Sequence, residues 1–234
     1  MPAETAAMRR VQAPICACAR PMSGLYACGM EEIGLFPLGL VLLPTEQVPL
    51  HIFEPRYREL IAECVDDEKP FGLIYADDDG LREIGTLATV VAITDRFADG
   101  RLNVVVEGGG RFRLAELTEG RSFHTGTIAP IDDRDDPPSP NDVRRGVQLF
   151  AKLVELTGAD VEVPDETVDQ PSFALASRFE LAPDLKLELL EETSERVRLV
   201  RLCEILETVA AAVERQREIA ERAARNGRAH PPQG

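Results

Sequence analysis

Four prolines are spaced through the aliphatic stretch Leu35–Tyr57, and they limit what this part of the chain can form. Proline donates no backbone hydrogen bond and breaks a helix interior, so Pro37, Pro44 and Pro49 are predicted at strand edges or corners. The apolar pieces between them are too short for helices and predict buried strands that turn sharply. Pro55 suits the first turn of a helix, because the N–H that it lacks would have no partner there. The predicted order is therefore kinked strands followed directly by a helix.

A helix is predicted over Pro55–Val65. Its apolar residues recur at i, i+3, i+4 and i+7, which places them on one face that can pack against the strands. These residues are Tyr57, Leu60, Ile61 and Cys64.

A β-hairpin is predicted around Asp99-Gly100, which lies between the runs Ile84–Thr94 and Arg101–Val106. An Asp-Gly pair between two β-branched runs is a strong hairpin signal. Arg111–Leu117 and Ser122–Ile131 supply further strands, so this part of the chain is expected to be strand-rich.

The segment Asp132–Asp142 holds five aspartates and three prolines. Such a composition cannot bury apolar surface and therefore predicts a linker between two subdomains. We expect a disordered leader over residues 1–31, a β subdomain over 32–131, this linker over 132–142, a helical subdomain over 143–222 and a disordered tail over 223–234.

Beyond the linker the apolar period changes to 3.6 residues, which predicts a set of helices. Asn141 is expected to cap the first helix, which ends at Gly158. Ser172 is expected to cap the second helix and Pro183 to open the third, while the last and longest helix starts near Ser194. The predicted apolar faces are Val143, Val147, Phe150 and Val154 in the first helix, Leu175 and Phe179 in the second, Leu185 and Leu189 in the third, and Leu199, Leu202, Leu206, Val209 and Val213 in the last.

The apolar seam of the last helix follows the alternating steps of three and four that packed helices share. Fewer than three full heptads are apolar, so packing onto the chain's own helices is favoured over a coiled-coil dimer. A monomer or a weak dimer is therefore expected.

The proline-rich stretch ends in Phe-Glu-Pro-Arg-Tyr, and further segments follow it in a fixed order. These are Ile84–Ala88, Asp99–Gly108 and Arg111–Arg113, with the helical region Ser172–Val213 after them. In order and spacing they resemble the LON N-terminal domain, the substrate-recognition module of Lon-type ATP-dependent proteases, and the resemblance covers Ile33–Glu214. It implies an α+β fold in which a PUA-like β-barrel subdomain with one inserted helix is followed by a C-terminal helical bundle ending in a long helix.

The formal net charge of −15 and a pI near 4.7 indicate an acidic surface. Such a surface repels phosphate backbones and anionic lipid heads, so neither nucleic acid nor membrane is an expected partner. The longest apolar run, Ile33–Pro44, is too short to span a membrane and contains two prolines. The Trp cage of the cereblon relatives of this family cannot form either, because tryptophan is absent. We expect a cytoplasmic protein.

The cysteines predict neither a metal site nor another cofactor site. Cys16, Cys18 and Cys28 lack a fourth ligand nearby and do not follow a usual zinc spacing. Cys64 and Cys203 fall on apolar helix faces, where a free thiol behaves as a small hydrophobic group.

No catalytic residue is predicted, because the sequence holds no GxxxxGK[ST] motif, GxSxG elbow or HExxH pair. The proteolytic site of Lon uses a serine with a lysine base, and the lysines here are Lys69, Lys152 and Lys186. Lys152 and Lys186 are expected on polar helix faces. This disfavours a pair of Lys186 with Ser172 or Ser177, since a lysine needs burial to lower its pKa.

Two other features are interpreted as structural. The run Gly108–Gly110 predicts a tight turn before Arg111, because a phosphate-binding loop would also need a helix N-terminus and a lysine nearby. His51 is expected to be packed and hydrogen-bonded beside the apolar corner rather than to act as a base.

Two surfaces are candidates for binding peptide. The first is the corner between the proline-rich strands and the first helix, where an aromatic side chain beside apolar residues suits capture of an unfolded chain. The alternative is that its two aromatic residues belong to the core and its arginines only solvate the helix. The second surface is Phe71–Tyr75, either as a free strand edge or as a strand paired within the sheet. The candidate residues of the first surface are Phe53, Glu54, Arg56, Tyr57 and Arg58.

The expected function is non-catalytic binding of unfolded or exposed protein segments, as an adaptor or quality-control factor that works with a protease or a chaperone. The alternatives are a peptidase acting alone and a small-molecule sensor that uses the mouth of the barrel.

Overall fold

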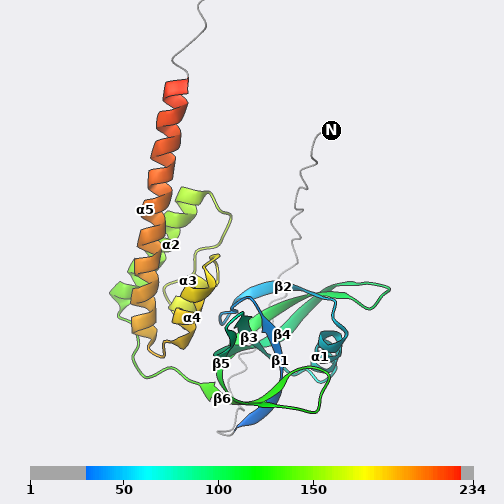
Figure 1. Cartoon of the computed structure of the whole chain (residues 1–234). Helices are drawn as coiled ribbons and strands as arrows, with labels where there is room; N and C mark the ends of the chain where they lie inside the picture. Colours follow the sequence, from blue (N-terminus) through cyan, green and yellow to red (C-terminus); the bar gives the residue numbers. More distant parts are fainter. Residues whose placement is uncertain (1–29, 228–234) are drawn as a thin grey trace, which may run out of the picture.

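The computed structural model describes residues 30–227, and Figure 1 shows that a strand-rich half precedes a helical half. The strands are β1 (Glu31–Leu38), β2 (Gln47–Ile52), β3 (Phe71–Asp77), β4 (Gly80–Arg96), β5 (Leu102–Thr118) and β6 (Thr125–Ile131). The helices are α1 (Pro55–Asp66), α2 (Pro140–Thr157), α3 (Pro171–Ala176), α4 (Pro183–Glu191) and α5 (Glu195–Gly227). The three N-terminal cysteines lie outside the described range.

The strands form one sheet in the order β2-β5-β4-β3-β1-β6, and β5 also pairs with β6. The predicted α+β class with a long last helix is confirmed, but the sheet is not the clean barrel that was predicted. Register shifts interrupt the β3–β4, β4–β5 and β5–β6 pairings, and bulges of this kind bend a sheet locally. The two long strands, β4 and β5, therefore change direction instead of following one regular cylinder.

The prolines lie where their missing N–H groups are tolerated, as predicted. Pro49 is in β2, which begins the strand order and pairs with β5. Pro37 is in the second half of β1, which pairs with β3, whereas β6 contacts the first half of that strand. Pro44 falls in the turn between β1 and β2, and Pro55 is the first residue of α1. The predicted helix and the hairpin formed by β4 and β5 are also present.

The prediction of a tight turn at Gly108–Gly110 is wrong, because strand β5 continues through these glycines. They accompany a bulge, since the register moves from Thr86↔Arg111 to Ala88↔Gly108. A Cβ atom at Gly108 would lie 2.1 Å from the carbonyl oxygen of Leu43. The glycine is therefore needed where the β1–β2 connection crosses β5 in close contact.

The helical half begins at α2, which ends at Gly158 in the left-handed conformation, as predicted. Its N-cap is Ser139 instead of Asn141, because Ser139 and Asp142 form a reciprocal capping box. The buried face is also rotated slightly from the prediction, and Gly146 lies close to both α3 and α5, since a Cβ atom there would be 3.2 Å from Leu175 and from Leu199. The buried residues of this face are Val143, Gly146, Phe150 and Leu153, while Val147 and Val154 are half-buried.

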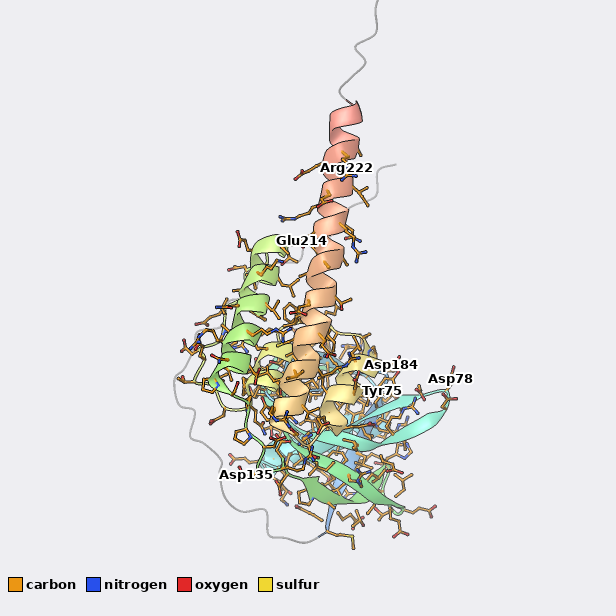
Figure 2. The ribbon with its side chains drawn as sticks, turned by 90° about the vertical axis from the view of Figure 1, so that its left-hand side faces the viewer. Tyr75, Asp78, Asp135, Asp184, Glu214 and Arg222 are labelled. Carbon is orange, nitrogen blue, oxygen red and sulfur yellow. The ribbon has the colours of Figure 1, made fainter. Side chains whose placement is uncertain are left out.

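The later helices follow the predicted order with local differences. Ser172 does not cap α3 but lies inside it, completely buried. Pro183 opens α4 as predicted. The α5 seam packs on the chain's own helices, but Ala210 is buried in place of Val209, which is 39% exposed. In Figure 2 the part of α5 that carries Arg222 extends past the other helices. The buried leucines of the seam are Leu199, Leu202 and Leu206.

The segment predicted as a linker is bound to both halves of the molecule. Asp133 accepts hydrogen bonds from Arg111 of β5 and from Arg198 of α5. Asp136 forms an ion pair with Arg196, at 2.9 Å between the Asp136 Oδ1 and Arg196 Nε atoms. Asp133 and Asp136 thus hold this segment in place through hydrogen bonds and ion pairs. The boundaries of the subdomains stay predictions.

A second contact joins the halves through Lys186, which was predicted on a polar helix face. The side chain is instead buried, and its ammonium group pairs with the carboxylate of Glu46 in the β1–β2 connection. Glu46 also accepts a hydrogen bond of 2.9 Å from the backbone N–H of Leu43. The prediction failed because the burial of Lys186 depends on a partner far away in the sequence.

Candidate functional site

The five candidate residues at the corner between β2 and α1 have different environments. Phe53 is 59% exposed, whereas Tyr57 is only 5% exposed. The Tyr57 ring lies against Phe36, with 4.1 Å between the ring centroids. Burial raises the pKa of the Tyr57 hydroxyl. Phe53 is thus a surface residue and Tyr57 a core residue, so the core alternative holds for Tyr57, whereas peptide binding at Phe53 stays a prediction.

An exposed aromatic cluster forms around Phe53 from two segments, the end of β2 and the β4–β5 hairpin. His51 from β2 stacks on Phe53, with ring centroids 6.0 Å apart, and Phe97 from the β4–β5 hairpin meets His51 edge-on at 6.1 Å. Phe97 is 41% exposed. We call the residues His51, Phe53 and Phe97 the aromatic corner. It presents three rings to solvent, and exposed aromatic groups of this kind are typical anchors for a bound chain.

Polar contacts hold the aromatic corner in shape. His51 Nδ1 lies 2.6 Å from the Asn103 side-chain oxygen, and the Arg101 guanidinium lies 5.3 Å from the centre of the Phe97 ring. His51 is therefore hydrogen-bonded as predicted, although it is exposed rather than packed inside. These contacts place the rings before any ligand arrives, which lowers the entropy that binding would cost.

The charged candidate residues form ion pairs and hydrogen bonds with other residues of the chain. Arg56 pairs with Glu54 at 2.8 Å and lies 4.6 Å from the centre of the Tyr57 ring. Arg58 donates a hydrogen bond of 2.7 Å to the carbonyl oxygen of Asp99. This bond ties α1 to the tip of the hairpin that carries Phe97. The sequence prediction missed His51 and Phe97 as members, although the predicted hairpin already placed Phe97 beside its turn.

The free strand edge next to this corner belongs to β2. Among the described strands β2 pairs with β5 alone, and it leads directly into Phe53. For Phe71–Tyr75 the second of the two alternatives holds, because β3 is paired within the sheet between β4 and β1. An extended peptide can add to a sheet at an edge strand but not at an interior one.

The groups that a serine–lysine peptidase would need are bonded elsewhere. The Ser172 hydroxyl donates to Glu195 over 2.7 Å and accepts from Arg198 over 2.7 Å. Lys186 pairs with Glu46, and the Ser177 hydroxyl lies 3.3 Å from the carbonyl oxygen of Ala174. The arrangement therefore does not pair Lys186 with either serine.

The thiols and the metal-ligating side chains offer no reactive centre in the part of the chain that the structure covers. Burial raises the pKa of the Cys64 thiol to about 11, so it is protonated at neutral pH. Burial likewise raises the pKa of Cys203. Within residues 30–227 no group of three or more histidine, cysteine or acidic side chains could hold a metal ion. No helix in that range is both long and apolar enough to cross a membrane.

Comparison with solved structures finds Lon N-terminal domains. A crystal structure of a Lon N-terminal domain protein from Xanthomonas campestris is 26% identical and has a TM-score of 0.59; the match covers 74% of this chain and 96% of that one. The N-terminal domain of a Mycobacterium avium complex Lon protease is 16% identical and has a TM-score of 0.63, covering 76% and 98% of the two chains. The second likeness is one of fold alone.

Curated relatives are full Lon proteases, of which this chain matches a part. Lon protease from Parabacteroides distasonis is 25% identical over 154 residues, which is 60% of this chain and 19% of that protein. Lon protease 1 from Hydrogenovibrio crunogenus is 23% identical over 213 residues, which is 84% of this chain and 25% of that protein. The chain thus spans a quarter or less of the length of these two relatives.

The family comparison identifies which part of a Lon protease is matched. The sequence model described as the ATP-dependent protease La (LON) substrate-binding domain matches residues 32–208. This region is distinct from the ATPase and protease domains. The chain therefore belongs to the LON substrate-binding domain family.

Proposed function

We propose that this chain binds unfolded or exposed segments of other proteins, without catalysis, at the aromatic corner and along the free edge of β2. The observation that carries the proposal is the exposure of Phe53 and Phe97 around His51, directly beside an edge strand. Membership of a family described as substrate-binding supports protein segments as the ligand.

The physical match is between what an unfolded chain offers and what the corner presents. An unfolded segment carries apolar side chains and unpaired backbone groups, but it has no fixed shape. The rings of the corner can cover apolar side chains, while the edge of β2 can pair with the backbone. Pro49 removes one donor from that edge, so the pairing would use the backbone groups on either side of it.

Binding without turnover is supported by the state of the reactive groups. The Ser172 and Lys186 side chains are held in separate buried contacts, and the Cys64 thiol stays protonated at neutral pH. A bound segment would therefore be retained or handed on, as in an adaptor or quality-control factor that delivers it to a protease or a chaperone.

The test is a fluorescence anisotropy titration with a labelled, reduced and carboxymethylated protein that cannot refold. Replacing both exposed rings, as F53A/F97A, should weaken binding by about thirtyfold, because an anchoring aromatic side chain can contribute about 2 kcal/mol. The matched control is V163A/V197A, which removes two exposed apolar side chains from the helical half. Equal affinities of the two double variants would contradict the proposed site.

A digestion assay with casein separates binding from peptidase activity. The purified chain should leave casein intact at concentrations that saturate the anisotropy signal. Cleavage that persists after repeated purification would overturn the non-catalytic part of the proposal.

A further inference from the structure

A groove with a volume of about 400 Å³ lies between the first half of β1, the end of α1 and the segment before β3. It shares no lining residue with the aromatic corner. We call it the β1 groove. It is lined by apolar and by acidic residues; the apolar ones are Ile33, Leu60, Leu87 and Phe123, and the acidic ones are Glu31, Glu32, Glu63 and Asp67.

The β1 groove is open because the chain turns away from β1 before β3 begins. Pairing between β1 and β3 starts at Leu35↔Gly72. Just upstream, Glu68 adopts a positive φ of 53°, and the backbone N–H of Lys69 bonds to the carbonyl oxygen of Cys64 in α1. Pro70 has no N–H to offer. The two residues before β3 are thus bound to α1 or unable to donate, so among residues 30–227 the start of β1 has no strand partner on that side.

The first half of β1 consequently has an open backbone edge. The backbone N–H of Leu35 points to β6, where it bonds to the carbonyl oxygen of His124 over 2.7 Å. Backbone N–H groups alternate in direction along a strand, so those of Glu32 and Gly34 point away from β6, to the side of the groove. An edge of this kind can accept an extended peptide as an added strand.

The charge of the β1 groove favours a cationic ligand. Two cations lie among the four carboxylates, and each is already paired: Lys69 lies 3.0 Å from Asp67, and Arg121 bonds to Glu63. The carboxylate of Glu32 accepts a hydrogen bond of 2.6 Å from Thr118, which leaves its charge in place. Glu31 and Glu32 therefore give the groove an excess of negative charge.

We propose that the β1 groove binds an extended peptide segment in which apolar side chains alternate with lysine or arginine. The apolar side chains of the peptide face Leu60 and Phe123, its cations lie on the opposite face of the added strand beside Glu31, and its backbone pairs with the start of β1. Glu32, on the Phe123 face, adds to the negative charge of the groove. This inference rests on the proposed function, because it names the class of segment that the domain selects.

The experiment compares two short labelled peptides, one of alternating lysine and valine and one of alternating glutamate and valine. The native chain should bind the lysine peptide at least about tenfold more tightly, which corresponds to about 1.4 kcal/mol. The preference should shrink as salt is added, because both carboxylates are exposed to solvent.

The decisive variant is E31K/E32K, which should abolish the preference for the lysine peptide. The matched control is D78K/D79K at the tip of the β3–β4 hairpin, where Figure 2 places Asp78. It changes the net charge of the chain equally, so it should keep the preference if the groove is responsible. A similar loss in both variants would overturn the proposal, since general attraction to an acidic surface would explain the result.

The strand pairing has a separate readout. A lysine peptide that is N-methylated at alternate backbone amides should bind at least about tenfold more weakly than the unmodified peptide, because it loses its hydrogen bonds to the edge. Equal affinities would contradict strand addition. Self-association of the chain that E31K/E32K abolishes would also overturn the proposal, since the occupant would then be a second copy.

Failure of this inference can be told apart from failure of the proposed function. If the carboxymethylated protein binds and F53A/F97A weakens it, while the two peptides bind equally, the proposed function stands and the groove's selectivity is refuted. If neither the protein nor the peptides bind, both are refuted.

Discussion

The guanidinium of Arg198 lies 3.9 Å from the centre of the Phe173 ring, and both side chains are completely buried. Arg111 approaches the same ring at 5.4 Å. Phe173 of α3 therefore packs with one arginine from α5 and one from β5. Asp133 accepts hydrogen bonds from both arginines, which joins the sheet, the acidic segment and two helices at one point.

Replacing Arg198 by methionine should lower the free energy of unfolding by about 3–5 kcal/mol, because Asp133 and Glu195 would lose their buried cation. Urea denaturation measures the change. The control is R201M on the same helix, where the arginine is 41% exposed and pairs with Glu188. That variant should cost about 1 kcal/mol or less. Equal costs would contradict a special role for the buried arginine.

The stability of the chain should fall in acid partly through Asp133. Burial by itself would raise the pKa of this carboxyl, but its hydrogen bonds and ion pairs with Arg198 and Arg111 outweigh burial and hold the pKa below its ordinary value of 3.8. A carboxyl with a lowered pKa stabilises the fold above its unfolded pKa, and this contribution is lost as the pH falls through the folded value. Urea denaturation at several pH values should show a steeper acid loss for the native chain than for D133N.

The sequence was sufficient for features that depend on neighbouring residues. Local backbone chemistry accounts for the positions of Pro37, Pro49 and Pro55. It also accounts for the hairpin around Gly100 and for the helix end at Gly158. The resemblance to the family then supplied the fold class, which periodicity alone would not have given.

The features that were missed depend on contacts between distant residues. Asp133 lies in a run typical of a solvated loop, and Lys186 was placed on a polar face because of its own charge, yet Arg198 and Glu46 make their burial possible. At the candidate site the exposure of Phe53 and the burial of Tyr57 were both left open. These two residues differ because Tyr57 lies in the core cluster that contains Phe36, whereas Phe53 stacks on His51 at the surface.

The Lys186–Glu46 pair should behave as a buried ion pair. K186M should lower the free energy of unfolding by about 3–5 kcal/mol, because it leaves the Glu46 carboxylate without a cation. The control K152M breaks an exposed pair with Glu214, at 2.8 Å, and should cost about 1 kcal/mol or less. The double variant E46Q/K186M should be more stable than K186M, since no unpaired charge remains. A double variant less stable than K186M would contradict this explanation.

The acidic surface predicts the behaviour toward nucleic acid. With a formal net charge of −15, the chain can neutralise few phosphates, so DNA and RNA should not be retained at physiological salt. A gel-shift titration measures this directly. A complex that survives added salt would contradict the prediction.

We expect Tyr57 to contribute to the stability of the fold and Phe53 to contribute to binding. Y57A should cost about 3–5 kcal/mol of stability, because it empties a buried site against Phe36. F53A should change stability by no more than about 0.5 kcal/mol, since the ring is 59% exposed. In the anisotropy titration F53A should weaken binding of the carboxymethylated protein about tenfold.

Y57F, which keeps the ring against Phe36, should retain both the stability and the affinity of the native chain. A loss of affinity in Y57F, with F53A unaffected, would place the binding contact on the Tyr57 hydroxyl instead of the aromatic corner.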